Sequence, residues 1–478
     1  MSSFSRMRAV RVAAGVVVAA ASVLVAGLLV TGGIPGFTVD AVSVSAQPPA
    51  TASVSTCAGP LLATGRDSTQ ADLLTDAAAQ TVSSTAAGGA TVSQSLLAAA
   101  DVSNGSGPVS LTAEPVDGAR TDLAAAASAV VADDDLAGFA ASACVRAQME
   151  SWLVTGAATT GSADLVVIAN PGEVAALVTL SVYGSTGLSE PAAGSDIVVD
   201  AGSQRVIPLA ALALGEENPI IRVTSSQTPV QASVQSSLTR VLTPGGVDQV
   251  AAVGAPAEEI VIPGVPVTVA PGEAGASNVP TSLRLLAPAS DGTATITVAG
   301  TSGEAIAPQT VQLTAGVPLQ IDLSGLEIGT YTVRIAASTP ITGAVWATTG
   351  FEEGSDFGWF TPAEALTDPT LVAVAPVTQD TTGPDAVLTL ASSASEDQVV
   401  TVSNVDGSDA REVTVPASGV AEVDVVAGAA YLVSPDGADG ADGAGVSAAV
   451  TFAGDGALAG YPVQPGDAEA AAILVYPR

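Results

Sequence analysis

The sequence predicts a mainly β protein: tandem immunoglobulin-like β-sandwich repeats that follow an N-terminal transmembrane helix. Three observations predict this class. A thirteen-residue stretch with strand-type alternation occurs three times, small and β-branched residues outnumber aromatic ones (3%), and one uncharged apolar run lies near the N-terminus. At 478 residues the chain is also too long for a single hydrophobic core, since a domain takes about 150 residues.

The N-terminus carries a predicted membrane anchor. Residues 1–11 are short and basic and form a cytoplasmic tail, whereas residues 12–31 are apolar and long enough to cross a hydrocarbon core. The positive-inside rule keeps the N-terminus in the cytoplasm and places the rest of the chain outside the cell membrane. The alternative is a secreted protein whose signal peptide is cleaved at Val44-Ser45-Ala46. Residues 32–56 form a stalk rich in Ser, Thr, Pro and Ala.

Cys57 and Cys144 are the only cysteines, and both follow the apolar run. On the extracytoplasmic side two cysteines favour a disulfide, which predicts that residues 57–150 form an N-terminal region tied at its ends. Secondary structure inside this region is ambiguous. Residues 109–113 alternate as a strand, whereas the alanine-rich residues 124–131 fit either a helix or a strand.

Three repeats fill the remainder of the chain, at residues 151–264, 265–377 and 378–478. Each contains one copy of the thirteen-residue stretch, in which apolar residues alternate, a turn follows at Ala-Gly or Ala-Ser, and alternation resumes. This pattern predicts a strand, a tight turn and a second strand at residues 197–209, 311–323 and 413–425. A last strand is predicted to close each repeat before a proline, at residues 260–262, 371–375 and 473–476.

Short motifs distributed over the chain add a resemblance to a known family. They are CAGPL at 57–61, DLAGF at 135–139, WLVTG at 152–156, GVDQV at 246–250 and DFGWFTP at 356–362. On these motifs the chain resembles an actinobacterial membrane-anchored or secreted cell-envelope family known only as a domain of unknown function. The resemblance implies a cell-envelope setting and supplies no catalytic residues.

The charged residues restrict the function. The chain has 47 acidic and 13 basic residues, a formal net charge of −34, and every basic residue is an arginine. Nucleic acid is excluded as a partner, because phosphate binding needs clustered positive charge. Without histidine and lysine there is no imidazole base, no ordinary zinc site and no Schiff base. We therefore expect no catalytic residue, no metal site, no cofactor and hence no enzyme.

One local cluster is a candidate binding site. Five aromatic residues lie within residues 346–360, interleaved with carboxylates, and the predicted ligand-binding residues are Trp346, Phe357, Trp359 and Phe360. Exposed rings of this kind stack on sugars while the acids accept hydroxyl hydrogen bonds; the alternative is that the rings pack inside the protein.

Two acidic segments are weaker candidates. Asp133-Asp134-Asp135 supplies oxygen ligands for calcium but lacks a spaced ligand loop, so a solvated acidic turn is the alternative. Residues 435–443 repeat Gly-Ala-Asp and are typical of a flexible loop.

Together these features predict a non-enzymatic, membrane-anchored, extracytoplasmic structural or interaction protein of the bacterial cell envelope. Its expected partners are the cell membrane, through the N-terminal helix, and an envelope protein or glycan. The alternative is a carbohydrate-binding module array that assists cell-wall biosynthesis. An enzyme that uses two carboxylates would need an acidic pair facing each other across a cleft, and no such pair stands out.

Overall fold

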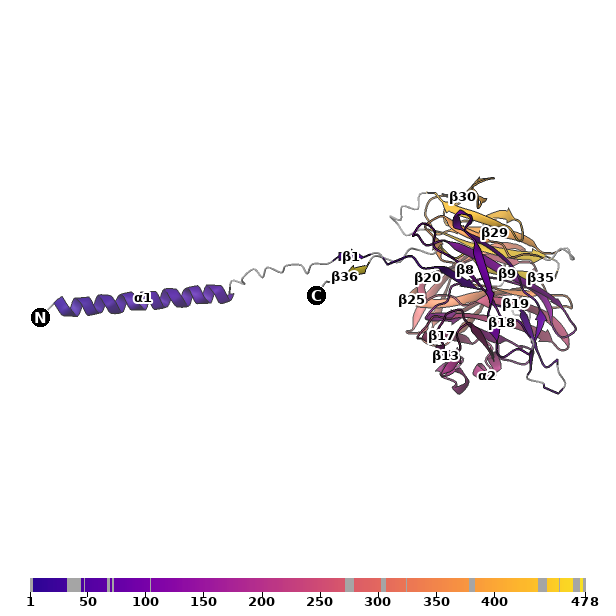
Figure 1. The fold of residues 1–478 in the computed structure, drawn as a ribbon, viewed down its shortest axis with the longest axis horizontal. Helices are drawn as coiled ribbons and strands as arrows, with labels where there is room; N and C mark the ends of the chain where they lie inside the picture. The colour runs from indigo at the N-terminus through magenta and orange to yellow at the C-terminus, as the bar shows by residue number, and fades with distance from the viewer. Residues whose placement is uncertain are drawn as a thin grey trace. The chain divides into compact units, whose positions relative to one another are not determined.

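The computed structural model is built mostly of antiparallel β-sheets (Figure 1). Two compact units are present: Met1–Pro49 together with Ala470–Arg478, and Ala50–Glu469, which we call the head. The predicted fold class, mainly β with one N-terminal apolar helix and β-sandwich repeats, is confirmed. The described residues are 3–31, 44–46, 48–66, 69–70, 73–103, 105–270, 279–301, 307–323, 325–377, 383–436, 445–454, 456–466 and 473–475.

Parts of three predicted segments lie outside the described residues. They are residues 32–43 and 47 of the stalk, residues 437–443 of the Gly-Ala-Asp loop, and residue 476 of the predicted last strand.

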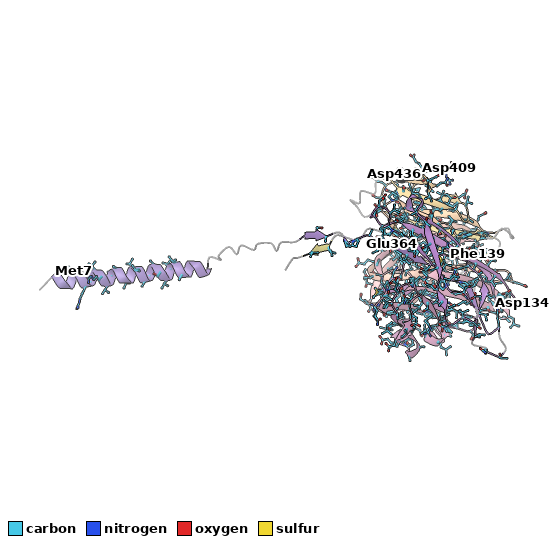
Figure 2. All side chains as sticks on the ribbon, viewed as in Figure 1. Met7, Asp134, Phe139, Glu364, Asp409 and Asp436 are labelled. Atoms are coloured by element: carbon cyan, nitrogen blue, oxygen red, sulfur yellow. A yellow bond between two sulfur atoms is a disulfide. The ribbon has the colours of Figure 1, made fainter. Side chains whose placement is uncertain are left out.

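The first unit contains one long helix, α1 (Ser3–Thr31), which includes the predicted anchor. Its segment Met7–Gly27 is long and apolar enough to cross a membrane and is exposed along its length, as Figure 2 shows for Met7. Length and composition fit a membrane anchor and a signal sequence alike.

The last described strand of the chain returns to the stalk. β36 (Ile473–Val475) pairs antiparallel with β1 (Val44–Ala46), and Leu474 lies opposite Ser45. The prediction that residues 473–476 close the third repeat is therefore wrong. A short apolar strand before a proline has the same sequence pattern whichever strand it pairs with, so the pattern could not identify its neighbour.

Each repeat in the head is a sandwich of two antiparallel sheets around its own hydrophobic core. The first repeat consists of β11 (Glu150–Leu153), β12 (Leu165–Asn170), β13 (Ala176–Gly184), β14 (Gly187–Ser189), β15 (Ile197–Val199), β16 (Ser203–Pro208), α2 (Leu209–Ala213), β17 (Ile220–Ser226), β18 (Gln231–Arg240) and β19 (Thr243–Ala251). The second consists of β20 (Ala257–Val267), β21 (Thr281–Leu286), β22 (Gly292–Gly300), β23 (Gln309–Leu313), β24 (Leu319–Asp322), β25 (Gly329–Thr348) and β26 (Phe357–Phe360). The third consists of β27 (Ala365–Leu366), β28 (Thr370–Ala373), β29 (Asp385–Ser392), β30 (Gln398–Asn404), β31 (Arg411–Val415), β32 (Val420–Val425), β33 (Ala430–Pro435), β34 (Val446–Gly454) and β35 (Ala457–Pro462).

All three repeats share one strand order. In one sheet the orders are β11-β17-β13-β15, β20-β25-β22-β23 and β28-β33-β30-β31; in the other they are β19-β18-β12-β16, β26-β25-β21-β24 and β35-β34-β29-β32. Alternation directs one side of each strand into the core. In β13, for example, Val178, Leu180 and Val182 are buried, whereas Thr179 and Ser181 between them are partly exposed.

The thirteen-residue stretch carries the chain from one sheet of each sandwich to the other. In the first repeat β15 pairs with β13, and β16 pairs with β12 in the opposite sheet. The second and third copies cross in the same way, through β23 and β24 and through β31 and β32. The predicted strand, turn and strand are confirmed, and the two strands lie in opposite sheets rather than forming a hairpin.

The predicted closing strands open the next repeat instead. β20 pairs with β25 of the second repeat, and β28 pairs with β33 of the third. The second and third repeats therefore begin at β20 and β27, before the predicted starts at residues 265 and 378. A following proline stops a hydrogen-bond ladder but does not determine which sheet the strand joins, which explains the error.

β25 distinguishes the second repeat from the others. It is a single strand of 20 residues, paired with β20 and β22 along its first part and with β21 and β26 along its last part. The first and third repeats use two separate strands for the same path, β17 and β18 or β33 and β34. One continuous strand thus belongs to both sheets of the second repeat.

The N-terminal region is a fourth module made of shorter strands. These are β2 (Ser53–Thr56), β3 (Leu61–Thr64), β4 (Leu74–Ala78), β5 (Thr81–Ala86), β6 (Val92–Leu96), β7 (Ala98–Ala99), β8 (Val109–Ala113), β9 (Leu123–Ala132) and β10 (Ala137–Ala143). The predicted disulfide is confirmed, since Cys57 and Cys144 are bonded and both are buried. The alanine-rich residues 124–131 are extended, in β9.

The last hairpin of every module lies at the centre of the head. Strand β10 of the N-terminal region packs against β19 and β35, and β26 packs against the same two strands. The four modules therefore close into a ring, with β20 and β25 of the second repeat visible between the first and third repeats in Figure 1. The sequence did not predict that the N-terminal region completes this ring.

One buried carboxylate joins all four modules. Asp356 Oδ1 accepts hydrogen bonds from the backbone N–H groups of Val247 (3.1 Å) and Phe357 (3.0 Å). Its Oδ2 accepts from the N–H groups of Phe139 (2.9 Å) and Leu458 (3.3 Å). These donors belong to β19, β26, β10 and β35. Asp356 is fully buried, so the four bonds offset part of the cost of removing its carboxyl from water.

Two glycines allow the neighbouring backbones to come this close. Gly138 (φ 150°) and Gly246 (φ 121°) directly precede two of the four donors. A Cβ atom at Gly138 would lie 2.7 Å from Asp356 Oδ1, and one at Gly246 would lie 2.5 Å from the same oxygen. Any larger residue would push its strand away from the carboxylate.

Replacing Asp356 should destabilise the whole head. In Asp356→Ala four buried N–H groups lose their acceptor, and we expect the free energy of unfolding to fall by about 4 kcal/mol or more, measured by urea unfolding of the full chain in lipid nanodiscs. The control is Asp134→Ala, which removes an exposed carboxylate and should change stability by less than about 0.5 kcal/mol. A small effect of Asp356→Ala would show that the ring does not depend on this residue.

Removing the disulfide should also destabilise the head. The bond joins cysteines 87 residues apart, and a loop of that length corresponds to about 4 to 5 kcal/mol of unfolded-state entropy in the simple chain model. We expect Cys57→Ala with Cys144→Ala to lower the free energy of unfolding by about 2 to 5 kcal/mol in the same assay. Equal stability of the double variant and the parent protein would contradict this expectation.

Candidate functional site

Each repeat directs an equivalent row of four side chains toward a neighbouring module. The row runs across four strands at directly paired positions, whose side chains share one face of the sheet. The rows are Pro208, Leu165, Gln235 and Gln249 in the first repeat; Asp322, Ser282, Trp346 and Trp359 in the second; and Asp424, Val387, Thr451 and Gly460 in the third.

Two of these three faces are closed by direct contacts. In the first repeat the Gln235 amide accepts a hydrogen bond from the Leu62 N–H (2.8 Å) and donates one to the Leu62 carbonyl (2.7 Å), which fixes the face to the N-terminal region. In the third repeat the Thr451 hydroxyl donates to the Gly264 carbonyl of the second repeat (2.8 Å). Both faces are therefore filled interfaces between modules.

The equivalent face of the second repeat is closed in part by aromatic packing, since Phe357 and Trp359 form one hydrophobic cluster with Trp152, Tyr183 and Val250 of the first repeat. It lies opposite the first repeat, and between them is a space of about 440 Å³, which we call the aromatic cleft. From the second repeat the cleft is lined by Ser282, Arg284, Gln320, Asp322, Trp346, Phe357 and Trp359. From the first repeat it is lined by groups that include Thr159, Ser162, Asp164, Glu217 and Asn218.

The structure brings three of the four predicted ligand-binding residues into this cleft. Trp346 lies directly opposite Trp359 on the neighbouring strand, and Phe357 is two residues before Trp359 on the same face. Phe357 and Trp359 are almost fully buried, whereas Trp346 is partly exposed and offers an accessible ring. Phe360 points the other way, into the core of the second repeat, because adjacent residues of a strand face opposite sides.

Arg284 fastens the two walls of the cleft together. Its guanidinium donates to the carbonyls of Gly156 (2.8 Å), Pro219 (3.2 Å) and Glu217 (3.3 Å) and to Asn218 Oδ1 (3.0 Å), all in the first repeat. It also lies 4.6 Å from the centre of the Trp359 ring, a cation–π distance. Burial lowers the pKa of Arg284 to about 9. An arginine within the apolar run Leu283–Leu286 was the sequence signal for this residue, and it was missed.

Asp164 faces the cleft from the first repeat. Burial raises its pKa to about 6, against hydrogen bonds from the Ser237 and Ala157 N–H groups (2.8 and 2.7 Å) and the Ser236 hydroxyl (3.1 Å), which lower it. Both carboxylate oxygens are engaged by these donors. The residue therefore contributes negative potential to the cleft while being held in place by the first repeat.

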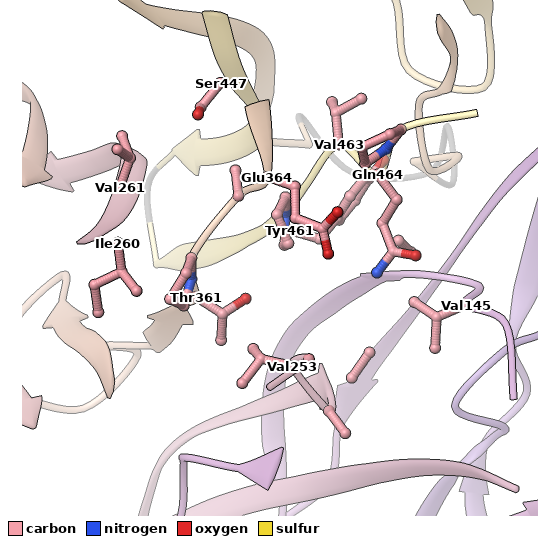
Figure 3. Close-up of a pocket in the computed structure, with 18 of the residues that line it drawn as sticks. Val145, Val253, Ile260, Val261, Thr361, Glu364, Ser447, Tyr461, Val463 and Gln464 are labelled. Atoms are coloured by element: carbon pink, nitrogen blue, oxygen red, sulfur yellow. The ribbon is translucent and has the colours of Figure 1, made fainter. Parts of the chain in front are cut away.

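A second space lies where the four central strands end. It has a volume of about 530 Å³ and is lined by the ends of β10, β19 and β35 and by the segment that follows β26. Glu364 and Gln464 direct their polar groups into it, and Val145 and Val253 form part of an apolar wall (Figure 3). Its ionisable groups, Arg146, Glu259 and Glu364, carry both signs, so its lining favours no single ligand class.

Two buried carboxyls lie near each other at the centre of the ring. Asp248 accepts hydrogen bonds from the Trp359 N–H (2.7 Å) and the Gln249 N–H (2.8 Å), and it is electrostatically coupled to Asp356. Both carboxyls are fully buried, so no substrate reaches them. Burial raises the pKa of Asp356 to about 8 against its four N–H donors, and burial with the neighbouring Asp356 raises the pKa of Asp248.

The acidic turn is paired with an arginine. Arg66 contacts Asp133 (2.7 Å) and Asp135 (2.7 Å), and Asp134 projects into solvent, as Figure 2 shows. Within the part of the chain that the structure describes, no group of three or more His, Cys, Asp or Glu side chains is arranged to hold a metal ion.

Fold and site together define a class of protein: a ring of four β modules with an aromatic cleft between two of them, preceded by an apolar helix. Residues 98–436 match a family described as "Family of unknown function (DUF5719)", and the chain belongs to this family. The matched region begins at β7 of the N-terminal region and reaches just past β33 of the third repeat. No protein among curated sequences matches the chain.

The buried carboxyls predict how stability depends on pH. Asp164, Asp248 and Asp356 all have pKa values above the value of 3.8 that an unperturbed carboxyl shows, so each binds its proton more tightly in the folded state. Stability from this source is complete below about pH 4 and is lost as the pH rises through about 6 and then about 8. We expect the free energy of unfolding to fall by about 2 kcal/mol or more between pH 5 and pH 9.

The matched variant is Asp164→Asn, which removes the group that titrates near pH 6. Urea unfolding of the full chain at pH 5, 7 and 9 should show a smaller slope between pH 5 and 7 in this variant and an unchanged slope between pH 7 and 9. Stability that increases from pH 5 to pH 9 would contradict the assignment.

Proposed function

We propose that this chain is a non-enzymatic, membrane-anchored interaction protein of the bacterial cell envelope, with its head on the extracytoplasmic side. One observation carries the proposal: four modules converge on the Asp356 carboxyl as one ring and leave a cleft between the first and second repeats. A protein built in this way presents a preformed binding surface and does not need moving domains.

The N-terminus and the cysteines support the location. An apolar helix precedes the head, and Arg6, Arg8 and Arg11 lie at its start, which favours a cytoplasmic N-terminus by the positive-inside rule. The Cys57–Cys144 disulfide persists in oxidising compartments and is rare in the cytosol. Both features favour a head on the outer side of the membrane.

The use of the ionisable groups supports a non-enzymatic role. Histidine and lysine are missing from the sequence, and the buried carboxyls of Asp248 and Asp356 are occupied by backbone N–H groups. Asp164, the carboxyl in the cleft with a raised pKa, has both oxygens hydrogen-bonded within the first repeat. These carboxylates stabilise structure and leave no acid–base pair for hydrolysis.

A second candidate function is carbohydrate binding in support of cell-wall biosynthesis. The observation that favours it is the Trp346–Trp359 pair on the floor of the aromatic cleft, beside the exposed Asp322 carboxylate. Aromatic rings with nearby hydroxyl-binding groups are the ordinary components of a sugar site.

The location is tested by fractionation of a Gram-positive bacterium that expresses the full chain. We expect the protein in the membrane fraction, cleavage of the head by protease added to intact spheroplasts, and no thiol labelled by maleimide until a reductant is added. Deletion of residues 3–31 should remove the protein from the membrane. A protease-protected head would contradict the proposed orientation, and a secreted product whose N-terminus begins near Ala46 would contradict the anchor.

A further inference from the structure

The aromatic cleft is a gap within an interface that all three repeats share. The same face of the sheet packs on a neighbouring module in all three repeats. In the first repeat Gln235 bonds twice to Leu62, and in the third Thr451 bonds to Gly264. The second of these faces borders a space of about 440 Å³, within the size range of ligand sites.

The paired residues at the equivalent positions of this face differ among the three repeats. Where the first repeat has Gln235 opposite Gln249, and the third has Thr451 opposite Gly460, the second has Trp346 opposite Trp359. Trp359 belongs to a hydrophobic cluster with Trp152 and Tyr183 of the first repeat and so also serves packing between the modules, whereas Trp346 is only partly buried against this cluster. A partly exposed indole at Trp346 is therefore available as a platform for the C–H face of a sugar ring.

Polar groups of the second repeat lie beside this platform. Asp322 is exposed at the end of the same row, and Gln320 lies beside it on β24. The Asp322 carboxylate accepts hydrogen bonds, and the Gln320 amide both donates and accepts them, as hydroxyl groups require.

The charges of the cleft exclude an acidic ligand. Asp164, Glu217 and Asp322 contribute carboxylates, whereas the one lining cation, Arg284, is already bound by four acceptors of the first repeat. The chain as a whole carries a charge of −34. An anionic glycan would meet repulsion at this site, whereas a neutral one would not.

We infer that the aromatic cleft is a single binding site for a neutral, hydroxyl-rich saccharide chain, formed jointly by the first and second repeats. Trp346 is the stacking residue, Asp322 and Gln320 bind hydroxyl groups, and Arg284 is a positioning residue that holds the walls together. The inference rests on the proposed function and names the chemistry of its partner. The carbohydrate-binding alternative from the sequence was an array of modules. The present inference instead predicts one site per chain.

The test is isothermal titration of the full chain, in lipid nanodiscs free of sugar detergents, with neutral gluco-, manno- and galacto-hexasaccharides. A uronate hexasaccharide serves as the anionic probe and tetralysine as the cationic one. We expect one neutral hexasaccharide to bind with one site per chain and at least tenfold more tightly than the uronate. Trp346→Ala should weaken binding at least tenfold, and Trp346→Phe, which keeps a ring, should retain most of it.

A matched pair of variants separates the site from general effects. Asp322 and Asp424 occupy equivalent exposed positions of the second and third repeats, so Asp322→Ala should weaken binding about tenfold and Asp424→Ala should leave it unchanged. Thermal unfolding of each variant checks that it remains folded.

Three results would overturn the inference: no binding of any neutral probe, equal binding by Trp346→Ala, or tighter binding of tetralysine or the uronate. None of these would affect the membrane fractionation, so failure of the site and failure of the proposed function are distinguishable.

Discussion

The head depends on the four N–H groups that converge on the Asp356 carboxylate. Because the four donors belong to four different modules, no pair of modules satisfies this carboxylate alone. The ring is therefore cooperative: loss of any one hairpin leaves the buried carboxyl with fewer partners, which is costly in a low-dielectric interior. This explains why the N-terminal region, which lacks the thirteen-residue repeat, is still an integral part of the head. Its hairpin β9–β10 supplies the Phe139 donor, and its disulfide limits how far that hairpin can move.

Alternation of apolar residues predicted the strands themselves. The sequence did not predict which strands and modules lie side by side. Strands such as β12 and β13 follow from period-two patterns, and the three crossings between sheets follow from the thirteen-residue stretch. The same patterns did not predict the partners of β20, β28 and β36, because the residues of an edge strand do not identify the sheet that it joins. The ring could not be predicted, because the groups that Asp356 binds are backbone N–H groups common to every non-proline residue. Within the candidate site, alternation along β26 would have separated Phe360 from Phe357 and Trp359, but it could not bring Asp164 or Arg284 beside them.

The three repeats share their architecture and differ in the row that faces a neighbouring module. In this head the core strands of the three repeats keep one order, whereas the row that faces the neighbouring module differs in every repeat. Two rows act as interface, through Gln235 and Thr451, and the third carries the tryptophan pair. That third face both joins two modules and borders the cleft. Arg284 joins the modules there, since it makes four hydrogen bonds to the first repeat.

The continuity of β25 determines how this gap can deform. Trp346 lies on the same uninterrupted strand that also pairs with β20 and β22 in the opposite sheet, so the floor of the cleft is braced across the whole thickness of the second repeat. A floor of this kind loses little conformational entropy when a ligand settles on it. The facing wall includes a short connection between α2 and β17, where Arg284 bonds to Glu217 and Asn218. The two walls therefore differ in construction: a continuous strand on one side and a loop bonded to Arg284 on the other.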